Sequence, residues 1–386
     1  MPAWRWREAA LLLTAFEVPF GHALLGAAVL LVVALGELVE GEPLWVRSPL
    51  DLGLLAWLGV ATASALVSPW RTTALGAAAA TAAVALPVVR AAVLAVRRRP
   101  AFARACLGAW AAGAVLAAVW ALSTLAPTAD ARATLPDLTA NALGTTLGVG
   151  LVVLTGLSPG ARGPVRVAVF LGLPIVALGL ALTWSRGGWL AAAAGLGVLL
   201  ALRPGRRLWW GLVTAAATAA LTIPVLTAQW TWHLDRLRQL LPATGPFSRV
   251  AVWHVALRVA AEHPVLGTGL ATFGVVYEQH AAPAAGPEHA PSAHNLVLHT
   301  AAELGALGVV ALAILLGAGL LAQARWYRRS PPGAPARTLA ATVLAATAAF
   351  VMHQMVDVTI IGLAVSVGLF LLLGLGAGAS ASESDP

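Results

Sequence analysis

Residues 165–202 read VRVAVFLGLPIVALGLALTWSRGGWLAAAAGLGVLLAL. They form two apolar runs, 165–184 and 186–202, which meet at a short turn that carries Arg186. Roughly 20 residues of α-helix cross a hydrocarbon layer about 30 Å thick, and each run comes close to that length. The stretch therefore predicts two membrane-spanning helices joined by a tight hairpin.

Apolar runs of this kind recur along the whole chain. Of the 386 residues, 59% are hydrophobic and 10% are charged, whereas a soluble domain carries roughly 25% charged residues. The sequence predicts further spans at 22–38, 50–68, 72–95, 105–126, 138–157, 207–226, 294–323, 335–355 and 359–378. We expect an all-α polytopic membrane protein with lipid as its main solvent.

The net charge of +8 is the difference between 24 basic residues, all of them Arg, and 16 acidic residues. These residues lie in short clusters between apolar runs, a pattern that orients membrane proteins rather than one that follows nucleic-acid phosphates. The distribution therefore argues against a nucleic-acid partner. The only cysteine, Cys106, lies within an apolar run, so the sequence excludes an intrachain disulfide and a cysteine-based zinc site.

The arginine-rich loops predict the topology, because such loops stay in the cytoplasm. From Arg97 onward the basic loops all fall on one side of the membrane. A cytoplasmic N-terminus with Arg5 and Arg7 needs an even number of crossings before Arg97, yet only three clear spans precede it. The short apolar segment 8–18, followed by the breaker Pro19-Phe20-Gly21, provides a further crossing. The prediction is about 12 transmembrane helices with both termini in the cytoplasm.

In this topology the extracytoplasmic side holds the stretch 126–137, the short turn at 184–187, the turn near Asp357 and one long segment, 227–293. A loop of that length with no structure of its own is uncommon unless it has a function. Apolar residues recur at helical spacing from Arg249 to Ala261, which predicts an amphipathic helix on the membrane surface. The expected organisation is N-terminal transmembrane helices at 1–226, a periplasmic loop at 227–293, and C-terminal transmembrane helices with a short tail at 294–386.

Two motifs place arginine on the extracytoplasmic side. In the first, Thr183–Trp189, the charge of Arg186 is costly at the membrane edge, so it either binds a ligand or reaches the lipid headgroups. In the second, Arg249 and Trp253 belong to the amphipathic helix, and a Pro and Gly turn follows it at 263–269. Arg holds diphosphate in a bidentate fork, and backbone N–H groups of such a turn can approach an anion. Ordinary solvation of a surface helix is the alternative interpretation.

The third motif begins a span with His294 and Asn295 and continues with His299 and Glu303 about one helical turn apart. A histidine at the membrane edge titrates near neutral pH, so it can take a proton from an attacking hydroxyl. The His299 and Glu303 pair is interpreted first as a structural hydrogen bond. No spacing typical of a metal site, such as HExxH, occurs in the chain.

Taken together, these motifs resemble the O-antigen ligase superfamily. The matching residues are, in order, Ser185-Arg186-Gly187-Gly188, Arg249 with Trp253, His263-Pro264 with Gly267-Thr268-Gly269 and Phe273, and His294-Asn295 through Glu303-Leu304-Gly305. Asn141-Ala142-Leu143-Gly144, at the start of a span, is also similar to that family's pattern. The order of the motifs around one long loop carries the resemblance more than any single motif does.

The resemblance implies a membrane glycosyltransferase of the GT-C fold type in the bacterial inner membrane, with its active site facing the periplasm. It would transfer a glycan from a polyprenyl (undecaprenyl) diphosphate to an acceptor hydroxyl, invert the anomeric centre, and need no metal or other cofactor. By this resemblance Arg186 and Arg249 would hold the donor diphosphate, and His294 would activate the acceptor. The other residues expected to contact substrate are Asn295, His263, Trp253 and Glu303.

The acceptor stays open at this point. An O-antigen ligase, which uses the lipid A core, is the leading expectation, and a polymerase that extends the glycan is the alternative; enzymes that glycosylate protein share the same motifs. A peptidoglycan polymerase of the shape, elongation, division and sporulation class has a comparable number of spans, but the motifs at 185–189 and 294–305 argue against it. A transporter or flippase would place ionisable groups near the bilayer midplane, whereas here Arg and His gather at one face.

Overall fold

The computed structural model describes residues 3–43, 45–126, 131–203, 249–280, 290–359 and 363–381. Within these ranges it contains thirteen α-helices and no β-sheet. The helices are α1 Ala3–Glu17, α2 Leu24–Val39, α3 Asp51–Val67, α4 Arg71–Arg98, α5 Phe102–Ser123, α6 Ala140–Leu157, α7 Gly163–Leu182, α8 Arg186–Leu202, α11 Arg249–Glu262, α12 Phe273–His280, α13 Leu296–Arg329, α14 Pro335–Gln354 and α15 Leu363–Ala381. The predicted span 207–226 and the loop residues 227–248 and 281–289 lie outside the described residues.

Every predicted span within the described ranges is occupied by a helix, and the protein is an all-α, multi-pass membrane protein. Six of these helices, α4, α5, α6, α7, α13 and α14, are long and apolar enough to cross a membrane, and α2, α3, α8 and α15 are shorter apolar helices. The number of crossings, the GT-C architecture and the side on which the termini lie stay predictions.

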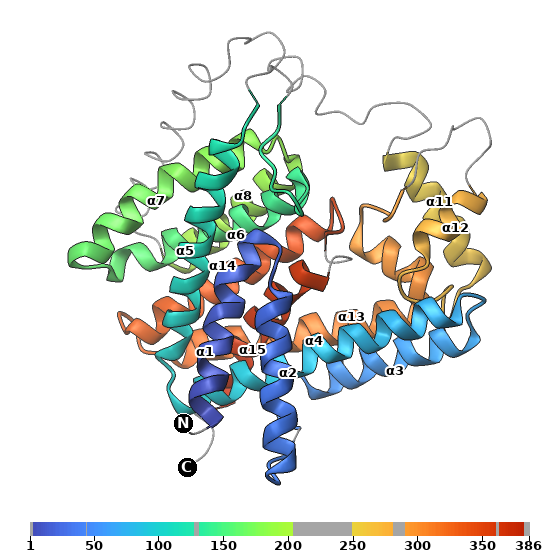
Figure 1. Ribbon diagram of the computed structural model, residues 1–386, viewed down its shortest axis with the longest axis horizontal. Helices are drawn as coiled ribbons and strands as arrows, with labels where there is room; N and C mark the ends of the chain where they lie inside the picture. Colours follow the sequence, from blue (N-terminus) through green and yellow to red (C-terminus); the bar gives the residue numbers. More distant parts are fainter. Residues whose placement is uncertain are drawn as a thin grey trace.

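The predicted N-terminal break at Pro19-Phe20-Gly21 is confirmed. Helix α1 ends at Glu17, and a single 3-10 turn covers Val18–Phe20. Gly21 then takes a left-handed conformation with φ of 75°, which glycine adopts without a steric penalty. Helix α2 follows and packs back against α1, as the dark blue pair in Figure 1 shows.

Helix α6 is the most buried of the six long helices and packs against α5, α7, α8 and α14. Glycines let α6 and α8 approach closely where they meet. A Cβ added to Gly144 would lie 2.6 Å from the Cβ of Ser185, and one added to Gly188 would lie 2.8 Å from the carbonyl oxygen of Gly144. The first turn of α8, with Arg186, is therefore held against the first turns of α6.

The antiparallel pair α3 and α4 extends to one side of the bundle, and α11 and α12 lie above its far end (Figure 1). Trp70, in the turn between α3 and α4, packs against an apolar cluster formed chiefly by α11 and α12. The cluster includes Val252 and Ala256 of α11 and Phe273 and Tyr277 of α12. The predicted amphipathic helix at Arg249–Ala261 is thus present as α11, and one of its faces packs against α12 and α13.

Helix α13 is broken at Gly305, where φ is 64° and ψ is −164°. The turn 263–269 inserts at this break and exchanges backbone hydrogen bonds with it. Thr268 and Gly269 donate to the carbonyls of Ala302 and Glu303 at 3.1 and 2.8 Å. In return, the N–H groups of Ala306 and Leu307 donate to the carbonyls of Pro264 and Val265 at 2.8 and 3.2 Å. The turn therefore satisfies polar backbone groups that the break would leave unpaired in a membrane protein.

Substitution of Gly305 by Ala should destabilise the protein. The new Cβ would lie 2.2 Å from the carbonyl carbon of Val265, and the positive φ is unfavourable for any residue with a Cβ. We expect a loss of more than about 2 kcal/mol, seen as a lower apparent Tm of the detergent-solubilised protein. Gly317→Ala, on the same helix with no neighbour within 4 Å, is the control and should leave the Tm unchanged or raise it. Equal Tm values for the two variants would contradict the role given to the break.

Candidate active site

The carboxylate of Asp357, in the connection between α14 and α15, is where three distant segments meet. Its Oδ1 lies 2.7 Å from Nδ1 of His294, and its Oδ2 accepts a hydrogen bond from the side-chain amide of Asn141. A guanidinium nitrogen of Arg249 lies 3.7 Å from the same Oδ2. The carboxylate is 6% exposed, whereas the side chains of His294 and Arg249 are 30% and 32% exposed. A substrate therefore has access to the imidazole and the guanidinium but hardly to the acid.

Burial alone would raise the pKa of the Asp357 carboxyl, but the hydrogen bond and charge of His294, with the charges of His353 and Arg249, hold that pKa below its usual range. Asp357 is therefore ionised at neutral pH. An ionised carboxylate only accepts hydrogen bonds, so Nδ1 of His294 carries a proton, and in the neutral form of the imidazole it is Nε2 that keeps the lone pair. The acid thereby selects the tautomer in which His294 can act as a base.

Arg186 is the first residue of α8, whose N-terminus is capped by the Ser185 hydroxyl, which accepts a hydrogen bond from the N–H of Gly188 at 3.1 Å. This turn lies against the end of α14, since a Cβ added to Gly187 would lie 2.9 Å from Nε2 of His353. Burial lowers the pKa of Arg249. The charge of Asp357 raises that pKa, and the charge of Arg186 lowers it further. The charges of Arg186 and Arg249 therefore act on each other, and an anion bound near both would relieve that repulsion.

The backbone before α13 presents His294 in a strained conformation, with φ of 51°. Asn295 caps the helix by accepting hydrogen bonds from the N–H groups of Val297 and Leu298, both at 3.0 Å. Its amide nitrogen also donates to the carbonyl of Met355 at 2.9 Å, two residues before Asp357. Asn295 thus ties His294 to the Asp357 connection. Trp184, just before Ser185, has a positive φ of 52° as well, so two of the three non-glycine residues with positive φ in the described chain flank this site.

Two further residues were expected to contact substrate, Trp253 on α11 and His263 just after it, and they lie in different places. Trp253 is one turn along from Arg249, and its indole Nε1 is buried with no hydrogen-bond partner among the described residues. His263 lies at the far end of the helix, about 20 Å from Arg249 at 1.5 Å per residue, with an exposed side chain. The structure therefore places Trp253 near the site and His263 away from it.

Glu303 lies at the break in α13 rather than beside Asp357. Its carboxylate accepts hydrogen bonds from the N–H groups of Ala271 and Phe273, both at 2.9 Å, and lies 3.5 Å from Nε2 of His299. The sequence suggested that backbone N–H groups of the 263–269 turn could approach an anion. In the structure the N–H groups of Gly267, Thr268 and Gly269 donate to backbone carbonyls.

Three residues of the site were given no role by the sequence, although Asn141 belongs to one of the quoted motifs. Asp357 is an acid in a short connection between two apolar runs, Asn141 is the second residue of α6, and Arg132 precedes α6. Arg132 donates hydrogen bonds to the carbonyl of Thr183 at 2.8 Å and to the side-chain oxygen of Asn141 at 2.9 Å. The predicted topology already put 126–137, 184–187 and Asp357 at one face, and this was the available signal.

Residues 168–313 match the family model described as O-antigen ligase. This stretch is an O-antigen ligase domain. It includes Arg186, Arg249 and His294, whereas Asn141 and Asp357 lie on either side of it. The resemblance inferred from the motifs is thereby confirmed over this range, and it indicates membrane glycan transfer of the ligase or polymerase type. No curated protein matches the chain.

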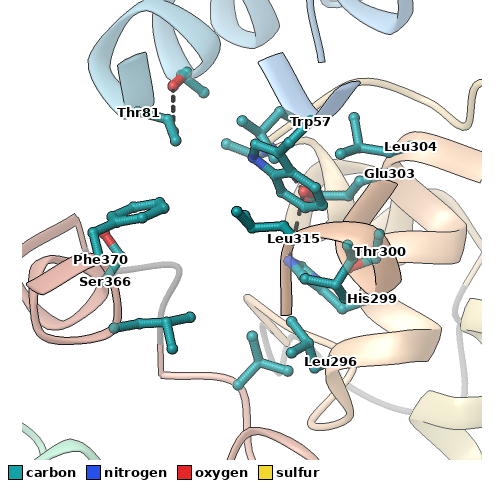
Figure 2. Close-up of a pocket in the computed structure, with 16 residues that line it drawn as sticks. Trp57, Thr81, Leu296, His299, Thr300, Glu303, Leu304, Leu315, Ser366 and Phe370 are labelled. Carbon is teal, nitrogen blue, oxygen red and sulfur yellow. Dashed lines mark hydrogen bonds and ion pairs between the residues drawn. The ribbon is translucent and has the colours of Figure 1, made fainter. Parts of the chain in front are cut away.

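An apolar chamber of about 250 Å³ opens beside this site. Residues from five segments line it. They are Trp57 of α3, Ala77 and Thr81 of α4, Leu270 with Ala271, seven residues of α13 between Leu296 and Leu315 that include His299, Thr300 and Glu303, and Val358 with Ser366, Leu369 and Phe370 before and on α15. Figure 2 shows Ser366 and Phe370 on one side and Trp57, His299 and Thr300 on the other. Leu296 and Val358 connect it with the site, because they lie next to Asn295 and Asp357.

Across the described ranges, no group of three or more His, Cys, Asp or Glu side chains is arranged to hold a metal ion. The polar groups around Asp357 are instead one carboxylate, imidazoles, amides and guanidinium groups.

The lowered pKa of Asp357 predicts a specific acid sensitivity. A group whose pKa is lower in the folded protein stabilises the fold above its ordinary value of 3.8 and loses that contribution as the pH falls below it. The apparent Tm of the wild type should therefore exceed that of Asp357→Asn by a constant amount from pH 7 to about pH 4, and the gap should narrow at lower pH. Fluorescence-monitored melting measures this gap.

The exposed Asp137, whose side chain is 70% exposed, provides the control for that series. Asp137→Asn should show no comparable gap at any pH. A gap between the wild type and Asp357→Asn that widens on acidification would mean that Asp357 is protonated in the folded protein.

Proposed function

We propose that the protein transfers a glycan from a polyprenyl diphosphate to an acceptor hydroxyl at the periplasmic face of the bacterial inner membrane. One observation carries this proposal: an imidazole and a guanidinium from separate segments meet at the buried Asp357 carboxylate, with a second guanidinium, that of Arg186, close by. A base and two permanent cations are the groups that such a transfer requires.

In the proposed reaction His294 is the base. Its Nδ1–H is held by Asp357, so Nε2 is available for the acceptor hydroxyl. The hydroxyl oxygen forms a bond to the anomeric carbon while its proton passes to Nε2. Asp357 then pairs with the imidazolium that results, which lowers the energy of the charged state.

The leaving group is the diphosphate of the donor. As the bond between the anomeric carbon and the diphosphate oxygen breaks, its electron pair goes to that oxygen, and negative charge grows there. Arg186 and Arg249 remain protonated at any relevant pH and bind phosphate oxygens in a bidentate fork. The N-terminus of α8 adds a further positive potential beside Arg186. Attack opposite the leaving group inverts the anomeric centre, and the two guanidinium groups take the role that a divalent cation has elsewhere.

The chamber supports a lipid-linked donor. Its lining is predominantly apolar, and it begins beside Leu296 and Val358, next to the residues that would hold the diphosphate. An isoprenoid chain that continues from that diphosphate would bury apolar surface there, which is favourable by about 25 cal/mol per Å². We propose that the first isoprene units of the donor occupy it.

An O-antigen ligase, with lipid A core as acceptor, is the leading form of the proposal, and polymerase is the alternative. The test is to incubate the purified full-length protein with an undecaprenyl-diphosphate-linked oligosaccharide, first alone and then with lipid A core. Transfer to the core identifies a ligase, and growth of the glycan without added core identifies a polymerase. No transfer to the core, to glycan or to protein refutes the proposed activity.

Substitutions at the three proposed catalytic residues should remove transfer without loss of folded protein. We expect His294→Ala to lower the initial rate by roughly 10²- to 10⁴-fold, and Arg186→Ala or Arg249→Ala by roughly 10²- to 10³-fold. The measurement is the initial rate of glycan transfer, with EDTA present, because two guanidinium groups need no divalent ion.

Helix α11 offers matched controls for that series. His254 and Arg258 lie on the same helix as Arg249 but are exposed, so His254→Ala and Arg258→Ala should keep full activity. Wild-type rates in any two of the three site variants, or strict dependence on an added divalent ion, would contradict the assignment.

The chamber predicts a separable effect on donor binding. Ala77→Phe places a ring in the chamber and should raise the KM for the lipid-linked donor at least about tenfold with little change in kcat. Ala79→Phe, on the same helix with an exposed side chain, should leave both constants unchanged. An unaltered KM in Ala77→Phe would show that the donor chain lies elsewhere.

A further inference from the structure

The connection that precedes α6 crosses the C-terminal end of α7. The N–H of Ala133 donates to the carbonyl of Leu182 at 2.8 Å, and Leu135 and Leu138 exchange two backbone hydrogen bonds of 3.1 Å. Arg132, at the start of this segment, joins two sides of the site. Its Nε donates to the carbonyl of Thr183, three residues before Arg186, and its Nη2 donates to the side-chain oxygen of Asn141.

Asn141 stands between a cation and an anion, and this decides the orientation of its amide. A guanidinium only donates hydrogen bonds, so the Asn141 oxygen must face Arg132. The ionised carboxylate of Asp357 only accepts, so the Asn141 nitrogen must face Asp357. Without Arg132, no hydrogen bond in this network keeps the Asn141 amide oxygen away from Asp357. A flipped amide would place that oxygen against a carboxylate oxygen, with no donor between the two.

We propose that Arg132 is a positioning residue for glycan transfer, which acts through Asn141 on the Asp357 carboxylate that orients His294. This inference rests on the proposed function and adds a third arginine to the site, with a role different from that of Arg186 and Arg249. Arg132 does not touch the substrate in this role. It holds one of the donors that keep the acid ionised and in place.

The effect of Arg132 has a defined sign. The groups around the Asp357 carboxylate are His294, Arg249 and Asn141, with His353 on α14 and Arg186 beyond Arg249. Of these, Asn141 is the one whose donor group depends on Arg132. Loss of its hydrogen bond removes stabilisation from the charged form of the carboxyl, so the pKa of Asp357 must rise. A role limited to fastening the 131–139 segment would leave that pKa unchanged.

The test is a double-mutant cycle on the full-length protein labelled with ¹³C-aspartate. The Asp357 resonance is assigned by its absence in Asp357→Asn, and its pH titration is compared in wild type, Arg132→Ala, Asn141→Ala and the double variant. We expect both single variants to raise the pKa of Asp357, and the double variant to match Asn141→Ala, because Arg132 acts through Asn141. The transfer rate of Arg132→Ala should fall roughly tenfold, as for loss of one hydrogen bond to a charged group.

Two further variants keep the result unambiguous. Arg132→Met retains the length of the side chain without a donor, and it replaces Arg132→Ala in the cycle if the latter does not fold. Arg329→Ala is the control, since Arg329 also donates to a backbone carbonyl, that of Ser380 at 3.3 Å, but at the other end of α13. It should leave both the titration and the transfer rate unchanged.

An Asp357 titration that is unaltered in Arg132→Ala but shifted in Asn141→Ala would overturn the proposal, and so would additive shifts in the double variant. The titration does not depend on any glycan substrate. If the wild type transfers no glycan while the cycle behaves as expected, the proposed function fails and the link from Arg132 to Asp357 stands.

Discussion

A carboxylate enclosed by membrane helices must be compensated by its neighbours, because an ionised acid without partners is too costly to bury. At Asp357 this requirement brings together Asn141 of α6, Arg249 of α11 and His294 before α13. These residues are separated along the chain, and they meet only when α6, α11, α13 and α14 are packed. The candidate site is thus a property of the whole bundle, and the family-matched segment 168–313 supplies only part of it.

The break in α13 imposes a second condition on the same region. Its freed carbonyls accept hydrogen bonds from the 263–269 turn, and the Glu303 carboxylate binds the N–H groups of Ala271 and Phe273 just after it. These bonds fasten the segment that carries α11 and α12 to the membrane helices. Gly267, Glu303 and Gly305 therefore support the site from a distance. Their place in the family-like motifs is explained by this anchoring, without any contact with substrate.

The spans and α11 were predictable because they depend on local composition. Apolar length, helical spacing and the placement of arginine each act within about 20 residues, and the sequence displays them directly. The same reasoning placed Arg186, Arg249 and His294 at one face. It did not reveal that Asn295 is engaged by Val297, Leu298 and Met355, or that Asn141 reaches Asp357 across 216 positions of sequence. Such pairings depend on how helices pack, and residue spacing carries no record of that packing.

The two contacts of Asp357 with ionisable partners differ in a way that suits the proposed reaction. The His294 contact is 2.7 Å long and the Arg249 contact is 3.7 Å, so Arg249 is the partner held less tightly. A diphosphate carries more charge than a carboxylate and accepts both arms of the guanidinium, so it can draw Arg249 away from Asp357. The acid then retains Asn141 and His294, so the hydrogen bond that orients the imidazole persists while the guanidinium turns to the leaving group. In this scheme one carboxylate serves both halves of the reaction, because it holds the base directly and releases a cation when the donor binds.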